Sequence, residues 1–265
     1  MGRQPPIYNV EEREGLRVAS KFNAQLMDHV RPHVTAGVKT RELDDLVREY
    51  TLEHGHTPAC LGYNGYPACS CISINEVVCH GIPDDRELDD GDIVNVDLTT
   101  IVNGWYGDQS ETFLIGQVSD EARRLVQVTF ESLWVAIRRI EPYGKVRDIG
   151  AAIYKYARER DFEIVREYQG HGIGRSFHQE PGIPHFWFRG TKAGGQVIRP
   201  GMCFTIEPML NIGTWKTNLD KFDNWTVRTL DGKLSAQFEH TILMGDDGPE
   251  ILTLTQNGPQ EGHSF

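Results

Sequence analysis

The chain has 265 residues and a net charge of −11, and it is 39% hydrophobic and 25% charged. This composition is that of an ordinary globular protein that can bury a sizeable core. The acidic balance disfavours a broad nucleic-acid-binding surface, because phosphates attract clustered Lys and Arg. The charged N-terminal segment and the lack of any apolar run near ~18 residues lead us to expect no signal peptide and no membrane span. We therefore expect a cytoplasmic protein with five reduced cysteines.

The first half of the chain opens with helical patterns and continues with strands. Apolar residues recur at helical spacing between Leu16 and Val30, which predicts a helix over 10–30. Thr40 is the expected N-cap of a second helix that ends near Gly55. The runs CISINEVVCHGI (71–82) and DIVNVDLTTIV (92–102) are rich in β-branched residues and predict strands.

The second half repeats helices before strands. Ser119 or Asp120 is the expected cap of a long helix that runs through Ile140, and another helix is predicted over roughly 146–160. The runs QFEHTILM (237–244) and PEILTLT (249–255) predict closing strands. Helices and strands mix without strict βαβ alternation, which favours an α+β fold. No linker divides the chain, so we expect a single domain over 1–265.

Two segments of the chain echo each other. LDDGDIVNVDL (88–98) and IRPGMCFTIEP (198–208) both contain a turn, a glycine, an apolar run and then an acid. Gly91 lies six positions before Asp97, and Gly201 lies six before Glu207. GVKTRELDDLV and YGKVRDIGAAI form a looser pair. Such short matches arise by chance or by duplication. Duplication predicts halves of about 10–118 and 119–255, each with one acid on an inner strand.

A predicted hairpin, VNVDLTTIVNGWYGDQS (94–110), contains two aspartates. Asn103-Gly104 is a strong signal for a type I′ turn, which places Asp97 opposite Ser110 and Thr99 opposite Asp108. Asp97 and Asp108 then share one face as diagonal neighbours about 7–8 Å apart. Two carboxylates about 5 Å apart repel by roughly 3 kcal/mol at an effective dielectric near 20. The face is therefore either solvated or a metal site.

Three further residues extend the metal hypothesis. Glu207 and Glu239 lie within apolar, strand-like runs, and His171 lies in the glycine-rich stretch QGHGIG. Four carboxylates and one imidazole suit two divalent cations, and ions ~3.5–4 Å apart activate a bridging water and polarise a carbonyl. Taken singly, each glutamate could instead be paired or exposed, and the histidine could belong to a surface loop.

Eight ordered segments carry a resemblance to a known family. They are CLGYNGYP (60–67), SINEVVCHGIP (73–83), DGDIVNVD (90–97), YGDQSETF (106–113), REYQGHGIGRSFH (166–178), PGMCFTIEPM (200–209), DNWTVRT (223–229) and SAQFEHTI (235–242). Over essentially its whole length the chain resembles the type I methionine aminopeptidases. This resemblance implies the pita-bread fold, in which two pseudo-symmetric halves with a curved antiparallel sheet covered by helices surround a dinuclear metal centre.

The resemblance also implies a reaction and a ligand set. Two divalent ions per chain (Co²⁺, Mn²⁺, Fe²⁺ or Zn²⁺) would activate water for attack on the first peptide bond. The result would be removal of the N-terminal methionine from newly made proteins with a small second residue. Asp97 would chelate one ion and accept the substrate α-amine, whereas Asp108 and Glu239 would bridge both ions. His171 and Glu207 would hold the other ion.

Further roles follow from the same resemblance. His178 would contact the substrate carbonyl, His80 would position or protonate the scissile nitrogen, and Glu207 would shuttle the proton. The methionine pocket would be lined by Cys60, Tyr63, Tyr66, Cys71, Phe177 and Trp225. Aromatic and sulfur groups suit a thioether, although from the residues alone they could equally be core packing, and the two histidines could be ordinary loop histidines. One Na⁺ or K⁺ would bind at Asn75, Val77 and Ser235.

Some features depart from the family pattern or leave alternatives. Gln109 follows Asp108 where the family commonly has a small residue, and we expect its side chain to point away from the face of Asp108. The loop FWFRGTKAGGQ (186–196) is unusually aromatic and could alter the rim of the site. The alternatives are an X-Pro aminopeptidase or prolidase, and a catalytically silent binding homologue. The expected partners are nascent N-termini near the ribosome, and the expected state is a monomer.

Overall fold

The computed structural model describes residues 4–189 and 194–265. Its helical elements are α1 (Val10–Val30), η1 (Arg31–His33), α2 (Thr40–Glu53), η2 (Tyr63–Gly65), α3 (Asp120–Arg139) and α4 (Val146–Arg158). Strands of the first half are β1 (Thr57–Pro58), β2 (Cys71–Ile74), β3 (Val77–Cys79), β4 (Ile93–Val102) and β5 (Trp105–Leu114). Those of the second half are β6 (Glu163–Ile164), β7 (Gly170–Gly172), β8 (Gln179–Ile183), β9 (Cys203–Ile206), β10 (Met209–Asn211), β11 (Thr217–Leu219), β12 (Val227–Thr229), β13 (Ser235–Gln237), β14 (His240–Met244) and β15 (Pro249–Ile251).

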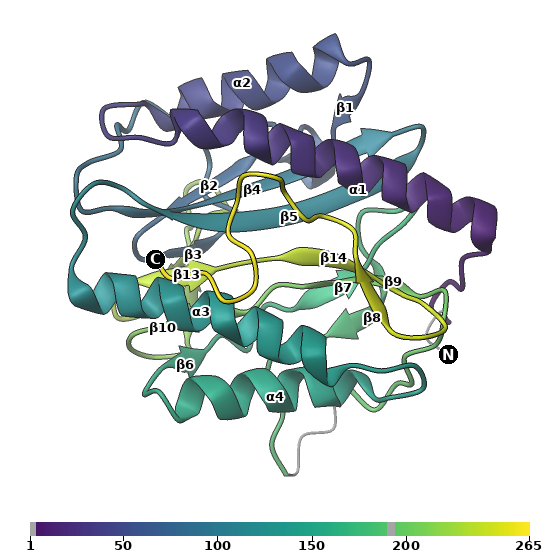
Figure 1. Ribbon diagram of the computed structural model, residues 1–265. Coiled ribbons are helices and arrows are strands. Elements are labelled where there is room, and N and C mark those ends of the chain that lie inside the picture. The colour runs from purple at the N-terminus through teal and green to yellow at the C-terminus, as the bar shows by residue number, and fades with distance from the viewer. Residues whose placement is uncertain (1–3, 190–193) are drawn as a thin grey trace.

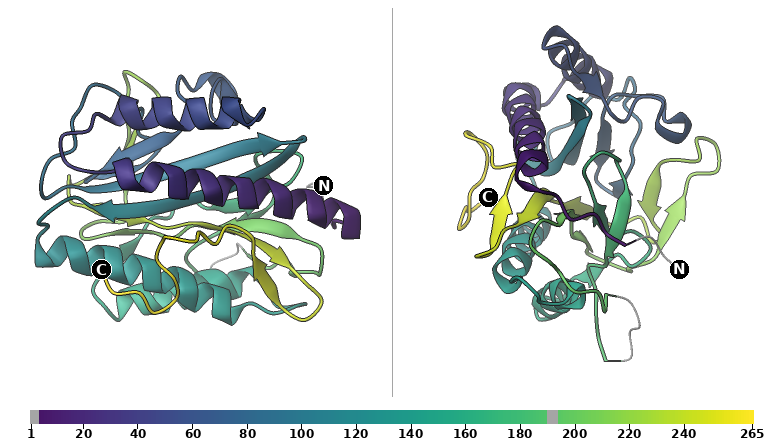
Figure 2. Two further views of the ribbon diagram at one scale, coloured as in Figure 1. Left: turned by 45° about the horizontal axis from the view of Figure 1, so that its top comes forward. Right: turned by 90° about the vertical axis from the view of Figure 1, so that its right-hand side faces the viewer.

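In the view of Figure 1, α1 and α2 lie in the upper part of the molecule and α3 and α4 in the lower part, with many of the strands seen between them. One four-stranded sheet holds β1, β4, β2 and β5, and a five-stranded sheet has the order β15-β14-β9-β7-β8. Two further sheets have three strands each, in the orders β13-β10-β6 and β11-β12-β3. The helices α1 and α2 cover the first sheet, and α3 and α4 cover the second half. The end-on view in Figure 2 shows these four helices on the same side of the strands. The predicted α+β fold is confirmed.

Helix boundaries follow their capping residues. Asn9 forms a capping box with Glu12 at the start of α1, and the Ser119 side chain accepts a bond from Ala122 N at the start of α3. The expected cap at Thr40 is one residue off, because Lys39 is the N-cap of α2 and Thr40 is its first residue. The Thr40 hydroxyl instead exchanges hydrogen bonds with Asp84. No helix of the described residues is long and apolar enough to cross a membrane.

The predicted β4–β5 hairpin is present with the predicted register. Asp97 pairs with Ser110 and Thr99 with Asp108. Asn103 and Gly104 have φ of 51° and 78°, which is the left-handed conformation that a type I′ turn needs at both positions. This turn therefore fixes the two aspartates on one face.

Three other strand predictions are too long, and the run 249–255 contains only the short strand β15, Pro249–Ile251. The run 71–82 divides into β2 and β3 because Asn75, at φ 54°, turns the chain between them. The run 237–244 divides at Phe238 and Glu239, so that β13 pairs with β10 while β14 pairs with β9. A change of sheet partner inside one apolar run leaves no signal in local propensity, because both pieces are equally β-forming.

Corresponding backbone hydrogen bonds recur in the two halves. Gly91 N donates to Ile115 O at 2.8 Å, and Gly201 N donates to Met244 O at 2.7 Å. Both glycines have positive φ, 100° and 88°. The sheets meet where Glu239 N donates to Ser110 O at 3.0 Å. These repeats support our proposal of one catalytic domain whose halves are approximately 10–118 and 119–255.

Candidate metal centre

A cavity of about 400 Å³ opens between the two halves. It brings together every predicted metal ligand, both predicted catalytic histidines and every predicted methionine-pocket residue. These are Cys60, Tyr63, Tyr66, Cys71, His80, Asp97, Asp108, His171, Phe177, His178, Glu207, Trp225 and Glu239. Residues up to 179 positions apart in the sequence therefore line the same cavity, as a functional site requires.

Strand ends of both halves deliver the acidic groups. Asp97 and Asp108 come from β4 and β5, whereas Glu207 directly follows β9 and Glu239 directly precedes β14. The side chains of Asp108, Glu207 and Glu239 are all buried. Charged groups are seldom buried without a counter-charge, so this concentration needs an explanation.

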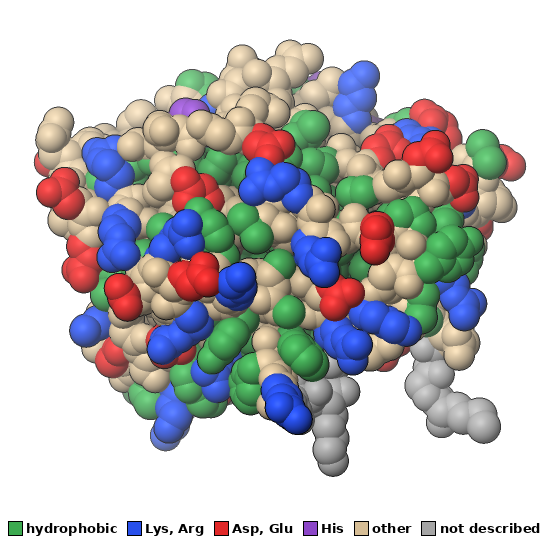
Figure 3. Space-filling view, turned by 60° about the horizontal axis from the view of Figure 1, so that its bottom comes forward, with side chains coloured by type: hydrophobic (Ala, Val, Ile, Leu, Met, Phe, Trp, Pro, Cys, Tyr) green, Lys and Arg blue, Asp and Glu red, His purple; other side chains and the backbone are tan. Residues whose placement is uncertain are grey.

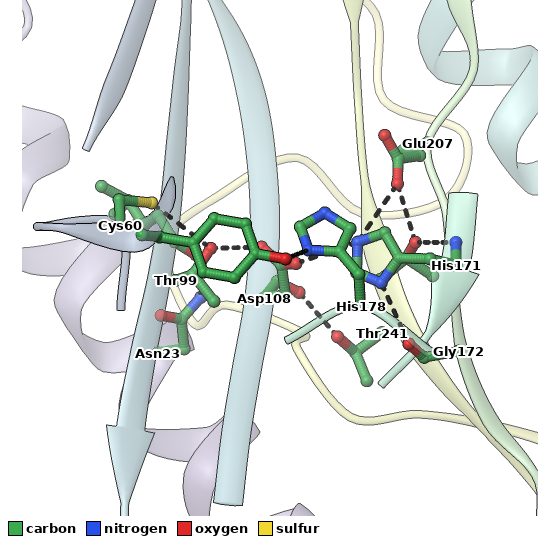
Figure 4. A network of polar contacts seen from close by, with 12 residues as sticks. Asn23, Cys60, Thr99, Asp108, His171, Gly172, His178, Glu207 and Thr241 are labelled. Atoms are coloured by element: carbon green, nitrogen blue, oxygen red, sulfur yellow. Dashed lines mark hydrogen bonds and ion pairs between the residues drawn. The ribbon is translucent and has the colours of Figure 1, made fainter. Parts of the chain in front are cut away.

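His171 stands among these carboxylates (Figure 4). Its Nε2 lies 3.5 Å from Asp108 Oδ2 and 3.7 Å from Glu207 Oε1. One ligand atom each of Asp108, His171 and Glu239 lie within 4.8 Å of one another. These separations exceed those of good hydrogen bonds and leave room for an ion between the groups.

The tautomer of His171 suits metal ligation. Nδ1 lies 3.1 Å from the carbonyl oxygen of Gly172, which can only accept, so Nδ1 carries the proton. The lone pair of Nε2 then faces the carboxylates, an arrangement that is unfavourable unless a cation lies between them. An outer hydrogen bond that fixes the ring in this way is typical of metal-binding histidines.

Without a cation, the clustered carboxylates repel one another. Burial, reinforced by the neighbouring Asp108 charge, raises the pKa of both Asp97 and Glu239 well above the usual range. Burial likewise raises the pKa of Glu207. Burial disfavours the His171 imidazolium, but contacts with Asp108 and Glu207 outweigh this effect and raise its pKa. The donor set of carboxylate oxygens and one imidazole therefore fits hard or borderline divalent ions.

Supporting side chains that the sequence did not single out hold these carboxylates. The hydroxyl of Thr205 donates to Glu207 Oε1 at 2.8 Å, and the Gln237 amide donates to Glu207 Oε2 at 3.2 Å. Thr205 and Gln237 lie two positions before Glu207 and Glu239, so strand alternation could have indicated them. His185 Nε2 accepts the backbone N–H of Glu207 at 3.1 Å, a contact across 22 positions that left no sequence signal.

His178 and His80 border the cavity as neutral rings. Burial, with a smaller contribution from His171, lowers the pKa of His178 to about 4. Burial also lowers the pKa of His80 to about 4. The Tyr63 hydroxyl lies 2.9 Å from His178 Nδ1. A hydroxyl that donates there leaves the proton on His178 Nε2, where it can be offered to a substrate oxygen.

Aromatic rings and thiols line the far part of the cavity. Tyr63 and Phe177 have ring centroids 4.8 Å apart, and Tyr66 and Trp225 meet edge to face at 5.1 Å. Cys60 and Cys71 are buried and reduced. The pocket is therefore apolar and rigid, and it suits an unbranched thioether.

Three predicted residues lie outside this cavity. Ser235 N donates to Asn75 O at 2.9 Å, which brings two members of the predicted monovalent-cation site together, and Val77 begins the neighbouring strand β3. The buried Ser235 hydroxyl has no hydrogen-bond partner among the described residues.

The two departures from the family pattern also lie away from the cavity. Gln109 is buried and borders a separate small cavity with Phe130 and His240. In the loop 186–196, Trp187 lies under the Arg147 guanidinium and Phe186 lies near that of Arg166. Residues 190–193 lie outside the described part of the chain. The described part of the loop is not among the residues that line the cavity.

Comparisons with known proteins agree with this geometry. Residues 14–246 match the family described as metallopeptidase family M24. A methionine aminopeptidase of Salmonella typhimurium is 49% identical over 253 residues, which cover 95% of this chain and 94% of that protein.

The chain belongs to the methionine aminopeptidases of metallopeptidase family M24.

Solved structures of the M24 family agree on the fold. The crystal structure of methionine aminopeptidase from Rickettsia prowazekii superposes with a TM-score of 0.91 at 45% identity, covering 95% of this chain and all of that one. Xaa-Pro dipeptidase from Bacillus anthracis shares the pita-bread fold, with a TM-score of 0.75 at 20% identity, and the match covers 96% of this chain but 63% of that protein. The predicted fold and family are confirmed, and the X-Pro alternative is not favoured.

Proposed function

We propose that this M24 enzyme is a metal-dependent methionyl aminopeptidase that removes the N-terminal methionine from nascent polypeptides with a small second residue. The observation that carries this proposal is the joining of a buried carboxylate–imidazole cluster to an apolar aromatic pocket in one cavity. The cluster supplies hydrolytic chemistry, and the pocket supplies selection for one unbranched side chain.

Membership of a metallopeptidase family implies a divalent metal. We propose two ions, Co²⁺, Mn²⁺, Fe²⁺ or Zn²⁺, held by Asp97, Asp108, His171, Glu207 and Glu239. When bound, such ions lower the pKa of water and polarise a carbonyl. Three buried carboxylates, the half-buried Asp97 and an imidazole whose Nε2 lies near Asp108 and Glu207 support this assignment.

The side chains of the chain itself would orient the substrate. Asp97, which lines the same cavity, would accept the free α-amine, and this would restrict the enzyme to chain ends. His178 Nε2–H would donate to the substrate carbonyl and stabilise its developing negative charge. Glu207 would take a proton from the attacking water and deliver it towards the leaving nitrogen, which His80 positions.

The pocket and the cavity wall would set specificity. Cys60, Tyr63, Tyr66, Cys71, Phe177 and Trp225 would enclose the methionine side chain. Tyr66 and Trp225 meet edge to face in this lining, and an apolar lining of this kind would disfavour a charged first residue. We also propose a Na⁺ or K⁺ site at Asn75, Val77 and Ser235, which the unpartnered Ser235 hydroxyl supports.

The proposed setting follows from the family. We propose that the enzyme works as a cytoplasmic monomer on chains that emerge from the ribosome. Basic and acidic side chains are interspersed over the face of the molecule in Figure 3. A peptide substrate, rather than a nucleic acid, fits this mixed surface.

The test is a metal-restored assay. The protein is stripped with a chelator, given Mn²⁺, Fe²⁺, Co²⁺ or Zn²⁺, and incubated with Met-Ala-Ser. Release of free methionine is expected, and little leucine should be released from Leu-Ala-Ser. Faster cleavage of an X-Pro peptide, or no cleavage with any ion, would contradict the proposal.

A further inference from the structure

A second hollow of about 680 Å³ lies beside the catalytic cavity. We call it the outer groove. It shares Gln169, His171 and His178 with the catalytic cavity, so the two spaces adjoin. The shared residues include the histidine assigned to the carbonyl of the scissile bond. A peptide whose first residue fills the apolar pocket can therefore continue into the outer groove past this histidine.

The lining of the outer groove is polar and nearly uncharged. Side chains of Gln4, Gln169, Gln179 and Ser176 border it, and Glu180 is the one acidic side chain among the described residues that line it. A glutamine amide offers two donors and an acceptor, so it can pair with peptide N–H and C=O groups whatever the side chains of the peptide are. The lining suits an extended main chain of arbitrary sequence.

Packing against a glycine holds the Gln169 amide in place, and a hydrogen bond holds that of Gln179. The Gln169 amide lies across Gly182, where a Cβ would come within 2.4 Å of Gln169 Nε2. Gln179 Nε2 donates to the Tyr8 hydroxyl at 2.7 Å. Tyr8 is buried against Trp105, and its N–H donates to Gly201 O at 2.9 Å. The N-terminal segment is thus pinned beside the outer groove and contributes Gln4 and Pro6 to its wall.

The outer groove also follows the edge of a sheet. Strand β8 is outermost in the five-stranded order, and its residues Gln179, Glu180 and Gly182 line the outer groove. The outer edge of such a strand has no strand partner within the described residues. Edge strands of this kind commonly accept an extended peptide through main-chain hydrogen bonds.

We infer that the outer groove binds the third and following residues of the substrate as an extended, sequence-independent segment, with Gln169 and Gln179 as its main-chain partners and Glu180 favouring a basic residue. This inference rests on the proposed function, because it takes the first residue to occupy the apolar pocket. It adds that the enzyme recognises a length of chain beyond the residue it removes.

A series of substrate lengths tests the inference. We expect kcat/KM to rise by about three- to tenfold from Met-Ala-Ser to Met-Ala-Ser-Gly-Ser-Gly-Ser, the gain of one net hydrogen bond. Gln179→Leu and Gln169→Leu should each remove most of this gain. Gln117→Leu, at an exposed position in the turn before α3, is the matched control and should preserve it.

The charge preference is tested separately. A heptapeptide with Lys at its fourth position should be cleaved about two- to fivefold faster than one with Glu, in the range of a surface ion pair. Glu180→Gln should abolish this ratio, whereas Glu159→Gln removes an equal charge from the exposed end of α4 and should leave the ratio unchanged. An equal fall in both variants would mean that only the net charge of the protein matters, and the role of Glu180 would be wrong.

Direct binding separates the failure of this inference from failure of the proposed function. Calorimetry with metal-free protein should show tighter binding of the heptapeptide than of Met-Ala-Ser, and Gln179→Leu should remove the difference. Cleavage and binding that do not depend on peptide length would contradict the proposed role of the outer groove but not the proposed aminopeptidase activity. Absence of cleavage at every length with every ion would overturn the aminopeptidase itself.

Discussion

Asp108 is bound from several sides at once. The Thr99 hydroxyl donates to its Oδ1 at 2.8 Å, and the Thr241 hydroxyl donates to its carbonyl oxygen at 2.7 Å. The first contact comes from the same hairpin and the second from the other half of the chain. The carboxylate is therefore fixed before any ion arrives, which lowers the entropy cost of binding.

We predict that Asp108→Ala abolishes turnover and weakens both metals, because Asp108 is proposed as a ligand of both ions. The loss of kcat/KM should exceed about 100-fold, the upper end for residues that only support a ligand. Metal titration by calorimetry and the methionine-release assay measure the two effects. Trp225→Ala is the control: it alters the pocket and should leave metal affinity unchanged. Near-normal turnover of Asp108→Ala would contradict its placement.

Tyr63 is expected to act through His178. Tyr63→Phe keeps the ring but removes the hydroxyl that sets the His178 tautomer, so kcat should fall by about three- to tenfold, the effect of one hydrogen bond, with little change in KM. In a His178→Ala background the same substitution should have less than about a twofold effect.

A matched variant makes this double-mutant cycle decisive. Tyr106→Phe removes a hydroxyl from the ring that stacks on Phe177, and its effect should be the same in both backgrounds. If Tyr63→Phe also had equal effects with and without His178, the hydroxyl would serve packing and not the tautomer.

At the scale of elements, α1 packs on β5 through a glycine. A Cβ at Gly107 would lie 2.6 Å from Ala19 O and 2.8 Å from Ser20 Cα, both in the α1 backbone. Gly107 directly precedes Asp108. The closeness of helix and strand at this point therefore also positions a proposed metal ligand.

We predict that Gly107→Ala lowers the free energy of unfolding by about 1–3 kcal/mol, as for overpacked cores, because backbone cannot yield as a flexible side chain can. Urea unfolding measures the loss. Gly195→Ala is the matched control, since a Cβ there meets no described atom within 4 Å, and its effect should stay within about 0.5 kcal/mol. Equal stability of the two variants would show that α1 can shift freely.

The elements were predictable where the signal is local. The Asn103-Gly104 turn alone set the register of β4 and β5, and alternation then placed Asp97 and Asp108 on one face. Local runs also indicated Glu207, Glu239 and His171 as candidates, and the resemblance assigned their roles as partners from the other half. The turn at Asn75 was missed because its strand-like neighbours mask it. His185, Gln4 and Gln179 were missed because their contacts depend on how distant segments pack, which local patterns do not encode.

At the scale of the whole molecule, the carboxylates lie at the seam between the halves. In metal-free protein Asp97 and Glu239 have raised pKa values. In the unfolded chain these carboxyl groups lose their protons at pH values near 4, whereas in the folded protein they keep them to higher pH. The stability of the metal-free protein therefore falls as pH rises above that range. Bound cations remove this penalty.

We predict that Mn²⁺ at about 100 times its Kd raises Tm by roughly 5–10 °C, and that the rise is larger at pH 8 than at pH 6. Scanning calorimetry with and without chelator measures it. Glu239→Gln should reduce the metal-induced shift, whereas Asp246→Asn, an exposed surface acid, should not. A shift that is larger at pH 6 would contradict the repulsion argument.

Glu239, whose N–H donates to Ser110 O, comes late in the chain, and this has a consequence for newly made copies of the enzyme. The first half, with both aspartates, leaves the ribosome long before the strand that carries Glu239. A chain made only as far as residue 238 already holds Asp97, Asp108, His171 and Glu207 but lacks the last proposed ligand. On the proposed ligand set, each new copy of the enzyme would remain inactive until this late residue has emerged and docked.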